Sequence, residues 1–313
     1  MIAICACTFK RRFGLTKLLE SLSKLEIEQD TSIIIVDNDG TDPKMEDVVL
    51  NAPLPPRTKI YYFIEPVPGI SAARNRAVAE AAKLGAEFIA MLDDDEWATP
   101  RWLVELTKVQ RETQAAVVGG PVKPVFSENR QNLNKLWSLW GVERMVLNGK
   151  PFVFCTCNFL ARMDAVLSLG AEPFDKAYGI TGGGDTVFFR KLFRDGYQMA
   201  WADEALLYED MPDSRANLGW LRQRRYRAGN VAVRWEQDVP IPPHPSPVLK
   251  TMLSLARFPI FPLTGWGRRH PLTGWLLEAE RLRGRITAHF GHFYSEYKRP
   301  AGSGTENTPT GQR

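Results

Sequence analysis

The first hundred residues alternate short apolar runs with helical patterns, and this alternation restricts the possible folds more than any other feature of the chain. The apolar runs predict strands over residues 2–7, 32–37, 60–64 and 88–92. Leucines at helical spacing follow the first run, and an alanine-rich helix is expected from Ser71 to a closing Gly85. Strands that alternate with helices are typical of a doubly wound sheet. The expected class is therefore α/β, with a mixed, mostly parallel sheet flanked by helices.

The pattern loosens after about residue 115. Thr99 and Pro100 predict the N-cap and first position of a helix over 100–113. Residues 115–122 and 152–161 read as further strands, with a loop and a helix between them. Helices are expected over 161–170, 185–196 and 218–235, and two apolar and basic stretches cover 248–263 and 272–290. The proline-rich segment 240–247 has the composition of a linker.

The charges are unevenly distributed along the 313 residues. Residues 1–213 carry 24 Lys/Arg against 30 Asp/Glu, whereas residues 214–313 carry 16 against 6. We divide the chain accordingly into a main domain (1–213), a basic and mainly helical C-terminal region (214–298) and a small polar tail expected to be disordered (299–313). An acidic body suits a metal-binding cleft, and a basic end suits phosphates or an anionic membrane face.

Two interpretations of the basic region stay open. It either touches an anionic membrane peripherally or forms helices that pack on the sheet. The chain passes from Met1 straight into a strand-like run, with no signal-peptide pattern, and no apolar run approaches the ~20 residues of a membrane span. We therefore expect a cytoplasmic protein, at most in contact with the inner face of the membrane.

The four cysteines form two C-x-C pairs, Cys5/Cys7 and Cys155/Cys157. Each pair lies in a strand-like run, where period-two geometry places both thiols on one face. Structural zinc sites usually space their cysteines as C-x₂₋₄-C on turns. Reduced thiols are therefore expected.

Acidic residues gather where two predicted strands end. Asp93, Asp94 and Asp95 follow the strand 88–92, and residues 37–42 contain a second cluster. Three adjacent carboxylates repel one another unless a cation or solvent compensates them. In open α/β sheets ligands bind at the carboxyl ends of the strands. The pattern predicts an oxygen-rich site for Mg²⁺ or Mn²⁺, which commonly bridges carboxylates and substrate phosphates.

Four motifs in order give the chain a family resemblance. They are VDNDGTD (36–42), PGISAARNRAV (68–78), LDDDEW (92–97) and ITGGGDTVFFRKL (180–192). In this order and spacing the chain resembles the family 2 inverting glycosyltransferases, which have the Rossmann-like GT-A fold. The resemblance covers roughly residues 1–215. It implies a nucleotide-diphosphate sugar as donor and a divalent metal.

The resemblance also implies roles for individual residues. Donor contacts are expected from the ends of the first strands, the ARN motif and the acidic run, at Thr8, Asp37, Asn38, Asp39, Arg74, Asn75, Asp93 and Asp94. Asp95, with Asp93, matches the metal-binding pair. Asp185 matches the catalytic base; a carboxylate there can take the proton of an attacking acceptor hydroxyl.

The chain departs from the family pattern at two places. The position before Asp185, often Glu in the family, is Gly184. Residues 223–227 only loosely echo the Q-x-x-R-W motif of processive members, and membrane spans are absent, so a single addition is favoured over polymer synthesis. The arginines of this segment either help to hold the diphosphate or form a basic surface.

The expected function is sugar transfer, with inversion and metal assistance, to a hydroxyl of a saccharide or lipid-linked saccharide. No nucleic-acid partner is expected. Plausible acceptor contacts are Trp137, Trp140, Asn158 and Trp201. The alternatives are a sugar nucleotidyltransferase, which would show a glycine-rich, lysine-bearing loop after the first strand, and a non-catalytic membrane-surface protein.

Overall fold

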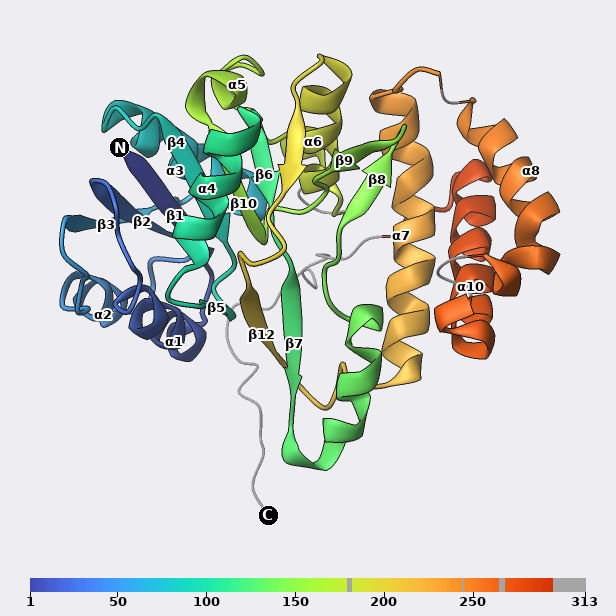
Figure 1. Cartoon of the computed structure of the whole chain (residues 1–313), viewed down its shortest axis with the longest axis horizontal. Helices are drawn as coiled ribbons and strands as arrows, with labels where there is room; N and C mark the ends of the chain where they lie inside the picture. Colours follow the sequence, from blue (N-terminus) through green and yellow to red (C-terminus); the bar gives the residue numbers. More distant parts are fainter. Residues whose placement is uncertain (179–181, 244, 265–267, 295–313) are drawn as a thin grey trace.

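A seven-stranded sheet forms the centre of the protein (Figure 1). The computed structural model describes residues 1–178, 182–243, 245–264 and 268–294. Across the sheet the strand order is β11-β6-β10-β4-β1-β2-β3. The strands are β1 (Ile2–Thr8), β2 (Thr31–Asp37), β3 (Thr58–Ile64), β4 (Phe88–Leu92), β6 (Val117–Gly119), β10 (Asn158–Arg162) and β11 (Met199–Trp201). The four strands predicted in the first hundred residues are confirmed.

The sheet is mixed but mostly parallel, as expected. Only β10 runs antiparallel to its neighbours, β4 and β6. All seven residues of β2 are buried, because helices cover both faces of a sheet of this kind. The parallel strands consequently end at one edge, where the predicted acidic clusters lie.

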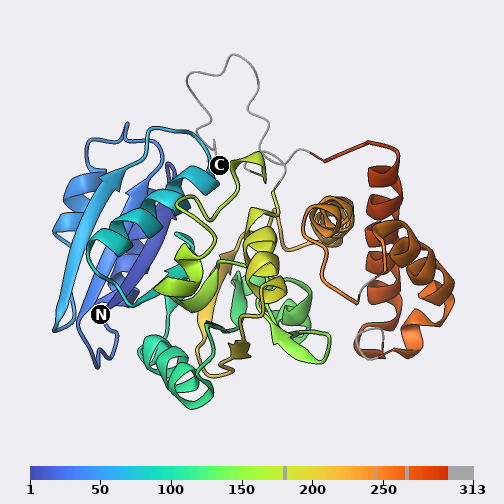
Figure 2. The same ribbon diagram turned by 90° about the horizontal axis from the view of Figure 1, so that it is seen from above.

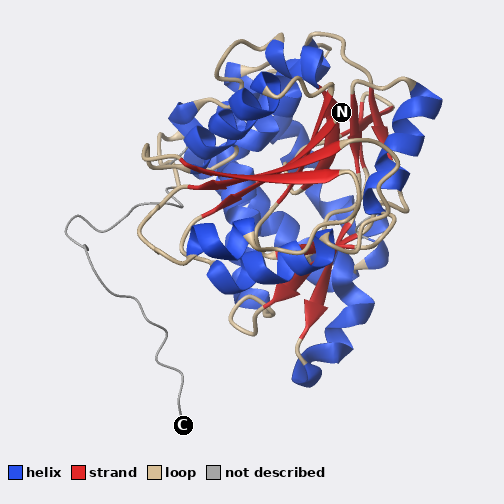
Figure 3. Ribbon diagram, turned by 90° about the vertical axis from the view of Figure 1, so that its left-hand side faces the viewer, coloured by secondary structure: helices blue, strands red, loops and turns tan. Residues whose placement is uncertain are grey.

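Helices cover both faces of this sheet (Figures 2 and 3). The core on one face includes residues of α1 (Arg12–Leu22), α2 (Met45–Leu50) and α4 (Trp102–Thr113). The core on the other face includes residues of α3 (Ile70–Lys83), α5 (Met163–Leu167) and α6 (Gly184–Arg194). These helices confirm the doubly wound arrangement. Gly85 follows the end of α3 with a φ of 73°, as expected for a glycine that closes a helix.

A second, three-stranded sheet has the order β5-β12-β7, and only its β7 lies partly within a predicted strand. It consists of β5 (Glu96–Ala98), β12 (Leu207–Met211) and β7 (Val122–Phe126). The 3₁₀ segment η1 (Glu128–Leu139) and the hairpin of β8 (Met145–Leu147) and β9 (Lys150–Phe152) follow β7, and η2 (Lys176–Tyr178) precedes α6. Because β5 begins directly after the acidic run, this sheet fixes the course of the chain beyond Asp95.

The predicted start of α4 is wrong by two residues. The helix begins at Trp102, with Arg101 at the N-cap position. Thr99 does not cap it, because its hydroxyl donates to the backbone carbonyl of Leu206 at 3.1 Å. The Thr99 side chain, which was expected to cap the helix, instead holds the chain before α4 to the backbone just before β12.

The strand predicted over 152–161 is also interrupted. β9 ends at Phe152 and β10 begins at Asn158, so Cys155 and Cys157 lie in the connection between them. This pair therefore does not lie on one face of a strand, as the sequence predicted. The two Sγ atoms nevertheless lie 2.7 Å apart. Cys5 and Cys7 both lie in β1 and pack against the same core.

The basic region is helical, as expected, with α7 (Leu218–Asp238), α8 (Pro247–Arg257), η3 (Phe258–Leu263) and α10 (Pro271–His289). α7 packs on the main domain: Arg190 of α6 donates twice to the carbonyl of Val239, at 3.1 and 2.6 Å. Tyr178 also bonds to Asp238. No helix among the described residues is long and apolar enough to cross a bilayer. The predicted tail (299–313) lies outside the described residues.

Candidate active site

The carboxyl edge of the main sheet brings three of the predicted segments together. Thr8 at the end of β1 pairs in register with Asp37 at the end of β2. The acidic run begins directly after β4, on the other side of β1. Two strand spacings, about 10 Å, therefore separate the chain at Asp37 from the chain at the acidic run. Thr8 joins these two segments: its backbone pairs with β2, and its hydroxyl donates to Asp94 at 2.8 Å.

Asp94 and Asp95 share an arginine. Arg11, just after β1, donates through Nη1 to Asp94 Oδ1 at 3.0 Å and to Asp95 Oδ2 at 2.7 Å. Burial raises the pKa of Asp94 to about 6, although Arg11 and Thr8 both lower it. Asp94 is thus held inside the site, whereas 30% of the Asp95 side chain stays accessible.

Asp93 links the acidic run to α3 and α6. Arg74 of α3 approaches it with Nη2 3.5 Å from Oδ1. Partial desolvation raises the pKa of Asp93, Arg74 lowers it, and the carboxylates of Asp95 and Asp185 raise it further. Asp185 is therefore within electrostatic range of Asp93. The structure places Asp95 and Asp185 near Asp93, and their roles as metal ligand and base stay predictions.

Asp185 lies in the first turn of α6, where the partial positive charge of the helix end favours an anion. Its Oδ1 accepts from the backbone N–H of Thr186 at 2.7 Å, which orients the carboxylate. Gly183, at the N-cap position, has a φ of 88°, which favours glycine. A Cβ on Gly183 would also lie 2.6 Å from Val231 of α7. The C-terminal region therefore packs directly against the turn that presents Asp185.

Asn75 and Ser71, one turn apart on α3, hold the segment that leads to α6. The Asn75 amide donates to the carbonyl of Phe174 and accepts from its N–H, both at 2.9 Å. Ser71 donates to the carbonyl of Asp175 at 3.1 Å. In this structure Asn75 is buried and positions backbone; contact with a donor stays a prediction. A Cβ on Gly184 would lie 3.3 Å from Tyr178 and 3.6 Å from Ser71, so the start of α6 is closely packed against η2 and α3.

The predicted residues at the end of β2 mostly organise the loops around them. Asp37 is buried and accepts from the hydroxyl of Tyr62 and the N–H of Asp39, at 2.8 and 2.9 Å. Asn38 donates to two carbonyls of the loop before α3 and accepts from the N–H of Gly69. Asp39 lies 3.7 Å from the ammonium group of Lys10. Contact of these residues with a nucleotide stays a prediction.

Sequence reasoning missed Arg11 and Glu209, and it considered Arg224 only as one of the arginines of residues 223–227. Glu209 lies in β12 and pairs in register with Glu96 of β5. Burial raises the pKa of Glu209 to about 7, as do Asp95 and Asp93, while Arg224 of α7 lowers it. The sequence signal that could have identified Glu209 is the segment LLYED (206–210). In it acidic residues follow a short apolar run, as they do in the first two clusters.

The acidic run supplies two accessible carboxylates for a divalent cation, those of Asp93 and Asp95. No group of three His, Cys, Asp or Glu in the described part of the chain is arranged to hold a metal ion. Mg²⁺ commonly uses only one or two carboxylates together with substrate phosphates. Asp93 and Asp95, which repel each other and both keep accessible surface, meet that smaller requirement. Arg11 holds Oδ2 of Asp95, one of the two oxygens of that carboxylate that a cation could use.

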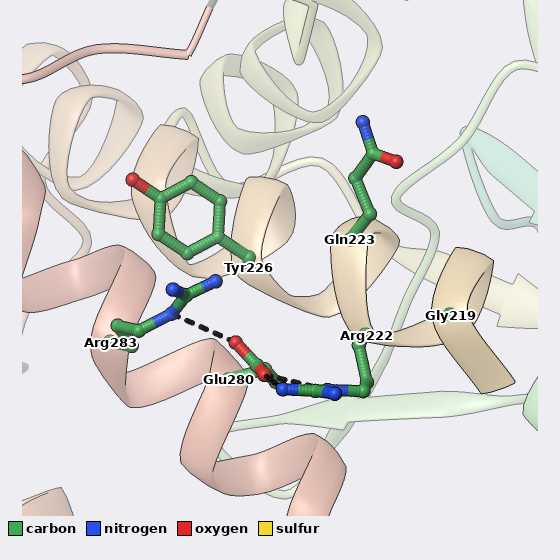
Figure 4. Close-up of a pocket in the computed structure, with 6 residues that line it drawn as sticks. All are labelled: Gly219, Arg222, Gln223, Tyr226, Glu280 and Arg283. Atoms are coloured by element: carbon green, nitrogen blue, oxygen red, sulfur yellow. Dashed lines mark hydrogen bonds and ion pairs between the residues drawn. The ribbon is translucent and has the colours of Figure 1, made fainter.

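The arginines of residues 222–227 are divided between two places. Arg224 donates to the carbonyl of Trp140 at 2.5 Å and is an electrostatic neighbour of Glu209. Arg222 instead lines a hollow of about 220 Å³ between α7 and α10, where it and Arg283 both pair with Glu280 (Figure 4). Of these two arginines, Arg224 is the one beside the acidic site.

Two of the four expected acceptor contacts are wrong. Asn158 is buried and bonds to Trp102, Pro121 and Ala205. Trp140 is buried too, and its indole N–H donates to the carbonyl of Arg215. Both side chains therefore hold the core together. Trp137 and Trp201 line a hollow of about 320 Å³ with Lys123, Arg144 and Asp203, and their contact with an acceptor stays a prediction.

Comparisons with known proteins identify the family of the chain. Residues 3–170 match the model of the family described as glycosyl transferase family 2. The succinoglycan biosynthesis protein ExoM of Rhizobium meliloti (strain 1021) is 33% identical over 234 residues, which cover 74% of this chain and 73% of that protein.

Solved structures share the fold at low sequence identity. The mannosyltransferase PcManGT from Pyrobaculum calidifontis, solved with GDP-Man and Mn²⁺, superposes with a TM-score of 0.58 at 15% identity, over 93% of this chain and 87% of that chain. TarS 1–349 of S. aureus gives a TM-score of 0.52 at 14% identity, over 94% and 92%. Both likenesses concern the fold.

Proposed function

The chain belongs to glycosyl transferase family 2 and is a glycosyltransferase that uses a nucleotide-sugar donor, and from this premise we propose a metal-assisted, inverting transfer to a saccharide hydroxyl. The observation that carries the proposal is the electrostatic proximity of Asp185 to Asp93, across the edge where α3, α6 and β4 meet. In the proposed mechanism Asp185 is the proton acceptor, and the diphosphate of the donor binds beside it at the acidic run. Family membership favours sugar transfer over the nucleotidyltransferase and non-catalytic alternatives.

The reaction is a single displacement. The acceptor hydroxyl gives its proton to the Asp185 carboxylate as its oxygen attacks the anomeric carbon. The bond from that carbon to the phosphate oxygen breaks as the new bond forms, and the nucleoside diphosphate leaves on the opposite side. Attack from the side opposite the leaving group inverts the anomeric configuration.

The leaving diphosphate is stabilised by cationic groups. Asp95 and Asp93 would hold Mg²⁺ or Mn²⁺, whose charge offsets the negative charge that develops on the diphosphate. Arg74 and Arg11, both at the acidic run, supply guanidinium groups suited to phosphate oxygens. The solved complex of PcManGT with GDP-Man and Mn²⁺ supports this donor and metal class.

The acceptor we propose is a saccharide or lipid-linked saccharide of a surface polysaccharide, which the succinoglycan role in the name of ExoM supports. The test incubates the protein with a panel of nucleotide sugars, Mn²⁺ and oligosaccharide acceptors. Proton NMR of the product reports the anomeric configuration. Inverted product that disappears with a chelator is expected. Retained configuration, or turnover unaffected by the chelator, would refute inversion or metal assistance respectively.

A further inference from the structure

The helix α8 has its polar side toward the protein and its apolar side outward. Thr251 is its buried residue, and its hydroxyl accepts from Arg285 of α10 at 2.9 Å. Lys250 pairs with Glu236 of α7 at 2.5 Å. Five large apolar side chains of the same helix are exposed: Val248, Leu249, Met252, Leu253 and Leu255. At helical spacing Leu249 and Leu253 lie opposite Thr251, with Met252 beside them, whereas Val248 and Leu255 lie nearer the Thr251 side.

This arrangement inverts the usual pattern of a helix in a water-soluble protein, in which the apolar stripe faces the core. Leu249 and Met252 are 48% and 60% exposed. The polar face already has its partners in α7 and α10. The exposed apolar face therefore needs an apolar environment that the described part of the chain does not supply.

The apolar surface continues beyond α8. Ile260 and Leu263 of η3 are exposed, as are Leu272 and Trp275 at the start of α10. Phe258 stacks on Trp275 with ring centroids 4.8 Å apart, which joins η3 to α10. Of the 23 exposed large hydrophobic side chains in the described ranges, 12 lie between residues 248 and 293. Contiguous apolar surface of this kind marks an interaction site.

The charges around this surface select its partner. Residues 239–277 contain no Asp or Glu, whereas Lys250, Arg257, Arg268 and Arg269 lie within them. Of these cations, Lys250 pairs with Glu236 and Arg269 with Glu143, which lie outside the segment. Arg257, Arg268 and Arg269 are exposed. An apolar face with cations beside it suits a bilayer that has anionic headgroups. Tryptophan also favours the boundary between headgroups and acyl chains.

We propose that the outer face formed by α8, η3 and the start of α10 docks on a bilayer that contains anionic lipid. Figures 1 and 2 place α8 at the rim of the molecule, beyond α7 and away from the sheets. The leucines and methionine of α8 enter the boundary between headgroups and acyl chains, and the arginines pair with lipid phosphates. The proposal does not depend on the sugar-transfer mechanism, since it concerns residues outside the acidic site.

The test is flotation of the full chain with vesicles of phosphatidylcholine alone and of phosphatidylcholine mixed with phosphatidylglycerol. The parent should float with the mixed vesicles and much less with the neutral ones. Leu249→Glu/Leu253→Glu should weaken binding by more than about tenfold, because two apolar anchors become charged. Arg257→Gln/Arg268→Gln should weaken binding to the mixed vesicles by about fivefold for each cation removed.

The matched control is Leu50→Glu/Leu167→Glu, which changes two leucines of α2 and α5 that are 49% and 42% exposed, against 48% and 42% for Leu249 and Leu253. It should float like the parent. Circular dichroism and melting temperature verify that each variant folds. Fluorescence quenching by brominated lipid adds an independent readout, and Trp275→Phe should reduce it.

Two outcomes would overturn the proposal. One is a Leu249→Glu/Leu253→Glu protein that folds and floats as well as the parent. The other is light scattering, without lipid, that shows a parent dimer and a monomeric variant, because the face would then be an interface between two copies.

Discussion

The side-chain amide of Asn75 forms hydrogen bonds with both backbone groups of a single residue, Phe174, 99 positions along the chain. Asn75 lies in α3 next to Arg74, and Phe174 begins the segment that leads to α6 and Asp185. Through this pair, the helix that reaches the acidic run also fixes the backbone before the proposed base. Two hydrogen bonds from one side chain to the backbone thus hold the segment before α6 to α3.

Asn75→Ala should slow transfer mainly through kcat, because the segment before Asp185 loses two buried hydrogen bonds. The free energy of unfolding should fall by about 1–3 kcal/mol, since the N–H and carbonyl of Phe174 are left unsatisfied. Steady-state kinetics and urea unfolding measure the two effects. Ser71→Ala, which removes one bond to Asp175, should be milder. Equal effects on kcat would argue against this role for Asn75.

Asp185→Asn should lower kcat by about 10²–10⁴-fold, because the amide cannot accept the proton of the acceptor hydroxyl. Binding of nucleoside diphosphate, followed by thermal shift, should change little. Asp195→Asn, at the other end of α6 and 37% exposed, is the matched control and should be fully active. Normal turnover by Asp185→Asn would remove this residue from the mechanism.

Arg11→Met should tighten the binding of Mn²⁺ in the absence of nucleotide. Arg11 holds Asp95 Oδ2 at 2.7 Å and so competes with a cation for that oxygen. Calorimetric titration measures the affinity. Arg12→Met is the matched control, because Arg12 is similarly exposed but pairs with Asp42, and it should not alter metal binding. Weaker metal binding by Arg11→Met would contradict the competition.

Stability should fall in acid through Glu236. Burial alone would raise its pKa, but Arg285 and Lys250 outweigh burial and the pKa is lowered from its ordinary value of 4.5. A lowered folded pKa gives stability that is present above the unfolded value and is lost as the pH falls below it. The free energy of unfolding of the parent should therefore drop more steeply below pH 4.5 than that of Glu236→Gln.

At neutral pH, Glu236→Gln should itself cost about 3 kcal/mol, because Arg285, 1% exposed, loses its ion partner. Glu172→Gln, which breaks an exposed pair with Lys176, should cost about 0.5 kcal/mol or less. Parallel pH profiles for the parent and Glu236→Gln would show that Glu236 does not carry the effect.

Gly284→Ala should destabilise the contact of α10 with α7, although alanine is normally the better helix former. An added Cβ would lie 2.0 Å from the carbonyl oxygen of Tyr226, so the two helices would have to separate. Overpacking of this kind costs about 1–3 kcal/mol. Gly219→Ala, whose Cβ would meet only the Asn217 side chain at 3.2 Å, is the control. A higher melting temperature for Gly284→Ala would refute the close approach.

The local pattern of the chain was sufficient for the main sheet and for part of the site. A run of branched aliphatic residues such as 33–36 suits a strand covered on both faces, and acidic residues after such strands meet at one edge. The fold class followed from the alternation of strands and helices, and the family and the expected proximity of the acidic run to Asp185 followed from four motifs in order along the chain. Thr99 failed as a cap because a distant carbonyl, that of Leu206, took its hydroxyl.

Tertiary structure alone decided which polar side chains remain available for chemistry. Asparagine is a residue type that commonly contacts ligands. Asn75 and Asn158 are nevertheless buried, and both bond to backbone groups far along the chain. Glu209 and Arg224 enter the site from β12 and α7, elements that pair or pack only after the chain has folded. The outward apolar face of α8 is a similar case. Periodicity identifies an amphipathic helix but not its orientation, because that depends on whether Arg285 and Glu236 lie beside its polar face.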